Sequence, residues 1–443
     1  MKVTAGHSPN AITQRLDKLS TLWQQFLSMP QARVCRWLIA DDEASMMDTF
    51  IGVESEDSTD FIFELNAPFI KSDTYGQHLS EELSELIEGI RPALQAEGFV
   101  INWFSQYEYD RRNAALGFMD NINALPYGFD AALEGGNTYL SGRQAELEVF
   151  IFCIKPTAIT KDYEMWLADA IEARIDPRVR LLLIDRKETM LLDKLAKKYQ
   201  GIVHTIQPEL DMPAAIRQLA ATGNPSDPGV KFRKAFVELT QAATRADISA
   251  VNKLAVLPLS IATENNWMPM QVAVHAVKGN TFLNAKRYNE ALQVYDHAYQ
   301  LAAAGYAQGD EIGGILTIQL LFAKATVFIS TKNFREAAET YSQAATRSEA
   351  LKDYFQVMEA RRMEGFCHQQ LSKPYESWDA YNLALQCAEQ LDTMTLENST
   401  FPYVGQALLD LAQKLGKKDD YFKIDKTMIA YIGTDWKKKI PKK

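Results

Sequence analysis

Three segments in the second half of the chain carry small and aromatic residues at the same intervals. From each origin, matching positions follow at offsets of 3, 9, 12, 16 and 19 residues. The origins and their followers are Gly279 (Phe282, Tyr288, Ala291, Tyr295, Ala298), Ala325 (Phe328, Phe334, Ala337, Tyr341, Ala344) and Gly365 (His368, Pro374, Ser377, Tyr381, Ala384). A weaker copy starts at Leu239 (Ala242, Ile248, Val251, Ala255, Pro258).

The spacing predicts pairs of closely packed helices. Small residues at offsets 0 and 12 let two antiparallel helices approach each other, and aromatic residues at offsets 9 and 16 fill the space around them. One such pair cannot bury its apolar face alone, so neighbouring pairs must stack. The pattern resembles the tetratricopeptide (TPR) repeat over roughly residues 230–416. The resemblance implies a helical array that binds another protein or a peptide.

The repeat departs from that family in two respects. No tryptophan stands at the start of each unit, and the origins lie 46 and 40 residues apart, whereas the common repeat has about 34 residues. The extra length is expected in a longer first helix or connecting turn around Ala304 to Gly314. Helices from Phe401 to Ile432 are expected to cap the stack.

In the TPR family the first helix of each unit lines a concave groove, which implies a set of contact residues here. Amide side chains can satisfy the backbone of an extended peptide, and an arginine can meet a carboxylate. The basic clamp that holds chaperone C-termini in some relatives is not reproduced. The groove candidates are Asn280, Asn284, Phe322, Thr326, Ser330, Arg362, Phe366, Gln369 and Gln370.

The first half of the chain has a different pattern. Short runs rich in Val, Ile and Phe, typical of buried strands, alternate with helical patterns, which predicts βαβ units and a mainly parallel sheet. The predicted strands are 33–40, 60–65, 99–104, 148–154, 179–184 and 202–206, and the predicted helices include 79–96, 161–174, 189–199 and 212–220. Residues 107–143 are expected to form a helix followed by a long loop.

We therefore predict an α/β N-terminal domain with Rossmann-like layering, followed by an all-α, TPR-like solenoid. The segment 221–229 contains two prolines and two glycines and reads as a linker. It separates an α/β domain over 1–220 from a repeat domain over 230–443, which includes capping helices and a basic tail.

Composition narrows the classes of partner. The formal net charge is -10, which argues against broad binding to nucleic acid or anionic membranes. We find no signal-peptide core and no apolar run of membrane-spanning length. The four cysteines never form a CxxC pair, so a cytoplasmic protein without disulfides is expected.

The lysine-rich end, Trp436 to Lys443, has two interpretations. It is either a frayed tail or a basic segment that binds an acidic partner electrostatically.

The usual catalytic and cofactor motifs are missing. The sequence has no GxxxxGK[ST], GxSxG, HExxH or post-strand GxGxxG pattern, and no metal-like His/Cys pair apart from the poorly placed Cys367-His368. No catalytic residue, metal or cofactor is therefore predicted. Leu38 to Glu43 resembles the first strand and acidic pocket of a receiver domain. The next predicted strand, however, ends in Glu64 to Pro68, and the strand over 99–104 ends in Ser105-Gln106, where a receiver domain needs an aspartate on a later, central strand. We expect Asp41 or Asp42 to cap the following helix, with Glu43 in its first turn.

Three other features have both a functional and a structural interpretation. Asp185 to Glu188 end the most apolar strand, where open α/β sheets bind ligands, yet they also suit a solvated turn that caps the next helix. His204 lies within a strand and reads as a buried, hydrogen-bonded histidine rather than a catalytic one. The segment Trp103 to Arg112 fits an exposed contact surface or a core strand that runs into a helix cap equally well.

The sequence leaves three functions to compare. The leading hypothesis is a non-enzymatic adaptor, chaperone or scaffold that uses the groove to hold a protein or peptide, as two-part adaptors of bacterial secretion and toxin-delivery machines do. The alternative is an enzyme or signalling protein with its activity in the α/β domain. A peptide-sensing regulator is a third hypothesis. Convergence of Asp41, Asp42 and Asp185 in one deep pocket would favour the enzyme.

Overall fold

The computed structural model describes residues 10–57, 60–96, 101–105, 115–133, 149–156 and 158–440. The chain divides into two compact units, Met1–Leu219 and Ala220–Lys443. Helix α8 begins at Pro228, inside the segment that composition assigns to the linker, and the Asp227 side chain accepts a hydrogen bond from the Gly229 amide at its start. Proline is favoured at this first helical position because its missing N–H has no partner there anyway.

The N-terminal unit is built on a five-stranded sheet with the order β2-β3-β4-β1-β5, in which all the pairings between strands are parallel. Its strands are β1 (Val34–Ile39), β2 (Phe61–Leu65), β3 (Phe150–Ile154), β4 (Val179–Arg186) and β5 (Val203–Ile206). Its helices are α1 (Ala11–Leu27), α2 (Ala44–Asp57), α3 (Ser72–Ala96), α4 (Leu116–Leu133), α5 (Lys161–Glu172), α6 (Asp193–Lys198) and α7 (Met212–Ala220). The predicted mainly parallel α/β sheet is confirmed.

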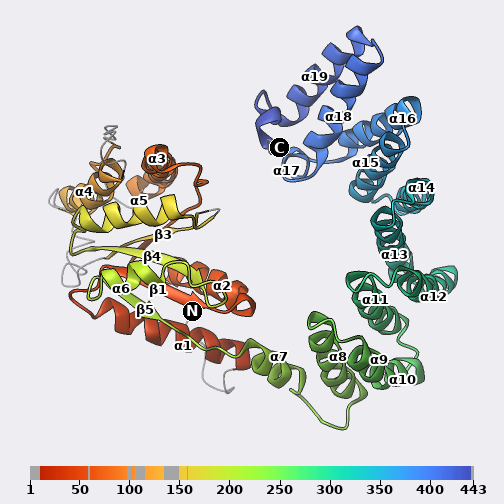
Figure 1. The fold of residues 1–443 in the computed structure, drawn as a ribbon, viewed down its shortest axis with the longest axis horizontal. Helices are drawn as coiled ribbons and strands as arrows, with labels where there is room; N and C mark the ends of the chain where they lie inside the picture. Colours follow the sequence, from red (N-terminus) through yellow and green to blue (C-terminus); the bar gives the residue numbers. More distant parts are fainter. Residues whose placement is uncertain are drawn as a thin grey trace. The chain divides into compact units, whose positions relative to one another are not determined.

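Helices cover both faces of this sheet (Figure 1). Helices α3, α4, α5 and α6 pack on one face, and α1 and α2 pack on the other. The chain leaves β1, which lies between β4 and β5, through α2, reaches the edge strand β2, and returns through helices on the opposite face. Because parallel crossovers are right-handed, a reversal of direction along the sheet moves the connecting helices to the other face.

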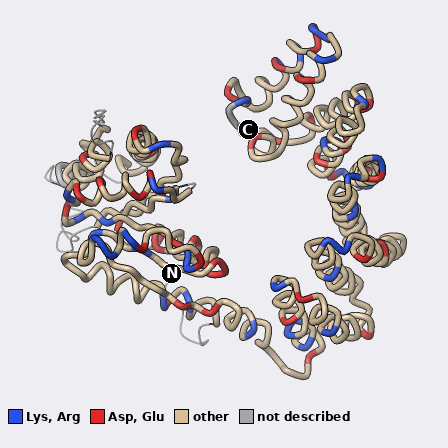
Figure 2. Tube along the Cα trace, in the orientation of Figure 1, with Lys and Arg blue, Asp and Glu red and all other residues tan. Residues whose placement is uncertain are grey.

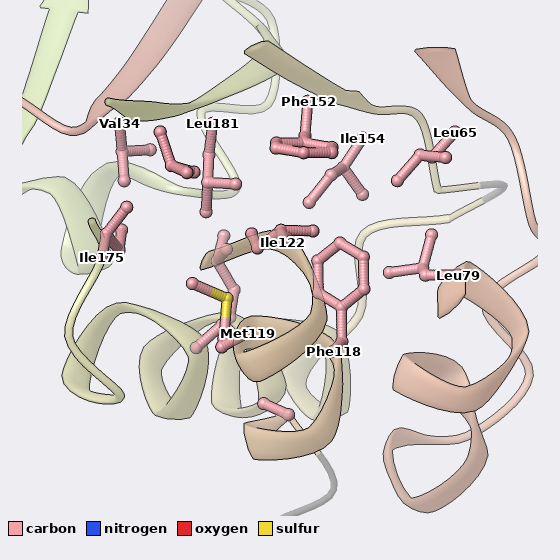
Figure 3. Close-up of a cluster of buried hydrophobic side chains, with 14 of the residues drawn as sticks. Val34, Leu65, Leu79, Phe118, Met119, Ile122, Phe152, Ile154, Ile175 and Leu181 are labelled. Atoms are coloured by element: carbon pink, nitrogen blue, oxygen red, sulfur yellow. The ribbon is translucent and has the colours of Figure 1, made fainter. Parts of the chain in front are cut away.

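The two faces have separate apolar cores, as expected for strands that are covered on both sides. Figure 3 shows one of them, where Phe118, Met119 and Ile122 of α4 point toward Phe152 and Leu181 on the sheet. On the opposite face, the core contains Trp23 and Trp37, whose rings stack with centroids 6.5 Å apart. Alternate residues of each strand therefore enter different cores, which fixes the register of the sheet.

The strand predicted over 99–104 is wrong within the described residues, because 101–105 form no strand. Their backbone groups bond to other elements: Asn102 N donates to the Gly128 carbonyl of α4, and Arg91 donates to the carbonyls of Ile101 and Trp103. These partners replace a sheet ladder. The segment Trp103 to Arg112 fitted either an exposed contact surface or a core strand. In it, Trp103 is buried and Phe104 is 66% exposed. Residues 106–112 lie outside the described residues.

The C-terminal unit contains helices and no strand among its described residues. The first group is α8 (Pro228–Thr244), α9 (Ile248–Leu254) and α10 (Val256–Glu264). Three antiparallel pairs follow, α11 (Met268–Asn284) with α12 (Tyr288–Ala307), α13 (Glu311–Ser330) with α14 (Phe334–Ala350), and α15 (Tyr354–Gln370) with α16 (Pro374–Gln386). A short helix, α17 (Thr393–Glu397), precedes the last pair, α18 (Phe401–Lys414) and α19 (Lys418–Ile432).

One type of turn joins most of these helices. After α11, the left-handed residue Lys286 donates to the Leu283 carbonyl and Arg287 donates to the Phe282 carbonyl, a Schellman motif. The same turn recurs at Ala246, Asn266, Gly309, Lys332, Lys352, Ser372 and Gly416. Each turn stops one helix and starts the next antiparallel to it.

Helix length, and not turn length, explains the unequal repeat length. Helices α12 and α13 each have 20 residues, whereas α11, α14 and α15 each have 17. Three residues connect α12 to α13, as at the neighbouring turns. The extra length therefore lies in the second helix of one unit and the first helix of the next. Of the two expected sources of extra length, the longer first helix is found in α13, whereas the connecting turn is not longer. One more helical turn preserves the packed face, and a longer loop would not.

The residues of the repeat pack as their spacing predicts. A Cβ atom added at Gly279 would lie 2.4 Å from the Tyr295 ring, and one added at Gly365 would lie 2.9 Å from the Tyr381 ring. Ala325, Ala337 and Tyr341 are likewise buried together in the second unit. The small residue at each origin therefore makes room for the aromatic residue at offset 16.

Helix α13 has the length and apolar composition of a membrane-spanning helix, in contrast to the expectation from sequence. It packs against α11, α12 and α14 in the middle of the array. Its apolar composition is therefore explained by burial against these neighbouring helices.

Substitution of Gly279 by alanine should destabilise the helical unit by about 1–3 kcal/mol, because the new methyl group meets the Tyr295 ring in a packed core. Urea unfolding followed by circular dichroism measures the change. Gly89→Ala is the control, because Gly89 lies within α3 with nothing within 4 Å of its added Cβ. It should be neutral or stabilising by up to about 1 kcal/mol. Equal effects of the two changes would contradict the packing argument.

Candidate protein-binding face

The carboxyl edge of the sheet is where an α/β unit would place a ligand. Helix α2 follows β1 on one face and α6 follows the adjacent β4 on the other, so the chain direction switches between these two strands. Asp185, at this edge, is 1% exposed and accepts hydrogen bonds from Arg36 Nε (2.9 Å) and Nη2 (2.6 Å). It also accepts from the amides of Leu191 and Leu192. The turn expected over Asp185 to Glu188 is found at residues 187–189, where Glu188 is exposed. Asp185 itself is not solvated, because its carboxylate is buried in an ion pair with Arg36.

The other acidic residues at this edge are also engaged in structure. Ala40, not Asp41 or Asp42, is the N-cap of the short 3-10 helix Asp41–Glu43 that precedes α2, so the predicted capping residues are wrong. Glu43 supplies the capping carboxylate instead, accepting from the amides of Ala40 (2.8 Å) and Leu210 (2.5 Å). Strand β1 ends at Ile39, so Ala40 takes the N-cap position. Asp41 and Asp42 therefore lie in the first turn of the 3-10 helix.

The three aspartates therefore do not converge in a pocket. Asp41 has a 77% exposed side chain 3.8 Å from Arg186, while Asp185 is buried. A cavity of about 580 Å³ lies beside α4, lined by residues that include Trp103, Asp120 and Tyr127, away from all three aspartates. Among the described residues no group of three His, Cys, Asp or Glu side chains could hold a metal ion.

His204 is half-buried, less enclosed than predicted, and its ring stacks near Phe26 with centroids 6.3 Å apart. It lies on the edge strand β5, which leaves one side of the residue open. The four cysteines are all buried as free thiols.

The helical unit presents a row of first helices. Figure 1 shows α11, α13 and α15 on the inner side of the curve of this unit and α12, α14 and α16 on the outer side. Helix α11 contacts both α8 and α13, so first helices lie next to one another. The predicted groove residues all lie on α11, α13 or α15. We call the exposed surface of these three helices the inner face.

The structure places the predicted residues of α11 and α13 in two environments. Asn280, Asn284, Thr326 and Ser330 have exposed positions on the inner face. Phe322 is half-buried, with its ring 5.5 Å from the Tyr341 ring. The polar residues are therefore available to a partner, whereas Phe322 mainly supports the packing of its own unit.

The predicted residues of α15 are more enclosed. Arg362 is half-buried and its Nη2 lies 2.9 Å from Glu359 of the same helix. Phe366 packs edge-on near Phe334, at 6.3 Å between centroids. Gln370 is exposed. An arginine that already has a carboxylate partner gains less from a second one, so Arg362 is a weaker candidate than its charge indicates.

Buried tyrosines orient several of the inner-face side chains. The Tyr295 hydroxyl donates to Asn280 Oδ1 (2.5 Å), and the Tyr381 hydroxyl donates to Gln369 Oε1 (3.3 Å). Burial raises the pKa of both tyrosines to about 12, so each hydroxyl keeps its proton and remains a donor at neutral pH. The aromatic residue at offset 16 therefore connects the core of each of these units to its inner face.

Exposed apolar residues on the same face were missed by the sequence reasoning. Ile315 precedes Thr326 by 11 residues, and Phe355 precedes Phe366 by the same interval, which is three helical turns. Ile315 is 51% and Phe355 is 36% exposed. Extending the helical periodicity toward the N-terminal ends of these helices would have found both. The inner face thus has apolar residues at one end of its helices and amide or hydroxyl residues at the other.

A small cavity adjoins Gln369. Its volume is about 160 Å³, and its lining includes Lys373, Asp410 and Lys414, at the turn between α15 and α16 and on α18. Pockets for small ligands usually exceed about 300 Å³. This one has room for a single side chain of a partner.

The pairing, turns and packing together decide the nature of this unit. It is a tetratricopeptide-like helical array. No protein-family model and no curated protein matches the sequence, so the assignment rests on the helices themselves.

The solved structures to which this chain is similar have low sequence identity to it. BtubC from P. vanneervenii is 14% identical, with 50% of this chain and 87% of that chain covered and a TM-score of 0.39. Aspartyl phosphate phosphatase F from Bacillus subtilis is 13% identical (81% and 73% covered, TM-score 0.36). A signal transduction ATPase with a tetratricopeptide repeat sensor from Pyrococcus horikoshii is 12% identical (88% and 53% covered, TM-score 0.34). None of these similarities carries over a function.

Replacing Arg36 by methionine should destabilise the N-terminal unit by about 3–5 kcal/mol, because Asp185 would remain as a buried carboxylate without its cation. Adding Asp185→Asn to that variant should cost less than the sum of the single changes, which urea unfolding in a double-mutant cycle measures. Lys71→Met, which removes an exposed ion pair with Asp73, should change stability by about 1 kcal/mol or less. Strict additivity would contradict the proposed coupling.

The helical unit should lose stability as the pH falls from about 6.5 toward 4. Burial and the neighbouring His297 lower the pKa of His275 from 6.5 to about 4. The unfolded chain therefore takes up a proton in this range before the folded chain does. Melting temperatures at several pH values should fall less steeply for His275→Gln than for the wild type. Parallel curves for the two proteins would refute the assignment to His275.

Proposed function

We propose that this protein is a non-enzymatic adaptor, chaperone or scaffold that holds a segment of another protein on its inner face. The observation that carries the proposal is the exposed face formed by α11, α13 and α15. It combines apolar residues such as Ile315 with polar residues such as Asn284 and Ser330. A water-exposed surface of this mixed kind, repeated along a stacked array, suits an extended or helical peptide.

The chemistry of the face indicates the chemistry of its partner. Ile315 and Phe355 would cover apolar side chains near the N-terminal ends of their helices. Asn284, Ser330 and Gln370, near the C-terminal ends, would bond to backbone N–H and carbonyl groups. The cavity next to Gln369 would receive one side chain. The partner is accordingly a segment with one apolar and one polar side.

We propose that the protein works in the cytoplasm, and that its α/β unit docks on a second component. The combination of an α/β unit with a repeat array is the argument for a place among adaptors of bacterial secretion or toxin-delivery machines. The carboxylates at the sheet edge support a scaffold in preference to an enzyme, because Asp185 and Glu43 are occupied by intramolecular partners.

Photo-cross-linking in the native cell tests the inner face. A photoreactive amino acid at Ile315, Thr326 or Ser330 should give a common adduct with one partner. The same amino acid at Arg335 or Glu339, which are exposed on the outer helix α14, should not.

A set of matched variants sharpens this test. Asn284→Arg/Ser330→Arg/Gln370→Arg adds bulk and charge at exposed positions of the inner face and should reduce the adduct at least about tenfold. The control Gln293→Arg/Gln343→Arg/Gln386→Arg adds the same charge to exposed positions of α12, α14 and α16 and should preserve it. Adducts that survive the first variant, or form equally from α14, would exclude the inner face as the binding site.

A further inference from the structure

The C-terminal end of the chain differs in charge from the remainder. Residues 414–443 contain ten lysines, no arginine and four aspartates, although the whole chain has an excess of ten acidic residues. Figure 2 shows basic positions along α19 and at the turn that precedes it. A local excess of positive charge on an acidic protein creates an attractive site for an anionic surface.

Helix α19 presents these charges together with exposed apolar residues. Lys418, Phe422, Lys426 and Ile429 follow at intervals of four, four and three residues, so they share one face of the helix. Phe422 is 73% and Ile429 is 38% exposed. Lys423 and Asp419 flank this face and are also exposed. We call these residues the basic apolar face.

The opposite side of α19 is firmly packed. Ile424, Met428 and Ile432 are buried in a core shared with α18. Trp436 is fully buried, and its ring nitrogen donates to Asp425 at 3.3 Å. A frayed tail is therefore the wrong interpretation for Trp436, because the residues after α19 hold the helix in place. The basic apolar face is presented by a fixed scaffold.

The residue composition of this face favours an anionic lipid surface over a protein partner. Phe422 and Ile429 are exposed large apolar side chains on the side of α19 away from its buried residues Ile424, Met428 and Ile432. Protein–protein interfaces favour arginine and are depleted in lysine, and this end has only lysine. Lysines around exposed Phe and Ile are typical of helices that bind anionic lipid.

We propose that the basic apolar face docks the protein on an anionic lipid surface. Phe422 and Ile429 would enter the boundary between headgroups and acyl chains, while Lys418, Lys423 and Lys426 would lie among the lipid phosphates. The surface binds peripherally and does not require α19 to leave its core. This inference is independent of the partner held on the inner face.

Vesicle co-sedimentation of the full chain tests the proposal. The wild type should bind vesicles of phosphatidylcholine with about one-third phosphatidylserine in ~0.1 M salt, and should be released in ~0.5 M salt. It should not bind phosphatidylcholine alone. Two variants, Lys418→Glu/Lys423→Glu/Lys426→Glu and Phe422→Ser/Ile429→Ser, should each lower the partition coefficient at least about tenfold.

A charge-matched control separates the face from overall charge. Lys231→Glu/Lys234→Glu/Lys253→Glu changes three exposed lysines of α8 and α9 and should bind as the wild type does. Equal loss in this control, unchanged binding of either α19 variant, or no vesicle binding by the wild type would overturn the proposal. Retention of the wild type on polyglutamate or duplex DNA, without vesicle binding, would assign the face to an acidic macromolecule instead.

Discussion

A tyrosine ring packed on a small residue of the preceding helix determines the geometry of the helical unit. Tyr295 packs on Gly279 and Tyr381 packs on Gly365. An added Cβ atom at either glycine would force the tyrosine ring to move. The contact sets how closely two helices of a pair approach. Because the same tyrosines donate hydrogen bonds to Asn280 and Gln369, the packing inside the array also positions side chains on its inner face.

The N-terminal unit depends on a different kind of contact. Its sheet is held between two apolar layers, and the buried charges at its carboxyl edge are paired within the chain. Arg36 and Asp185 are both nearly inaccessible, so removing either side chain would leave the other buried without its partner. This edge therefore stabilises the fold at the place where many α/β proteins bind ligands. We therefore place the site that holds a partner segment on the helical unit, and we do not place it at this edge of the sheet.

Much of the fold could be predicted from periodicity. Strands over Val34–Ile39 and Phe150–Ile154 were indicated by apolar runs, and the helix pairs were indicated by the repeat. The segment at Ile101 misled the prediction, since a short apolar run forms a strand only if another strand is available to pair with it. Its carbonyl instead accepts a hydrogen bond from Arg91, and that partner is invisible to a local pattern.

The candidate contact residues were predictable only in part. The helices that carry Asn284 and Ser330 follow from the repeat, but the pairing of Arg362 with Glu359 and the enclosure of Phe366 depend on neighbouring helices. The exposed Ile315 and Phe422 were overlooked, because an apolar residue on a helix is usually counted as core.

The sequence by itself determined the order of the two architectures, the pairing of the helices and the small residues that permit it. These features follow from spacing along one chain, which local sterics and helical periodicity govern. Only the tertiary structure decided where the extra helical turn lies, which carboxylates are sealed, and which apolar residues remain in water. Those outcomes depend on contacts between residues that are distant in sequence, as between Arg36 and Asp185.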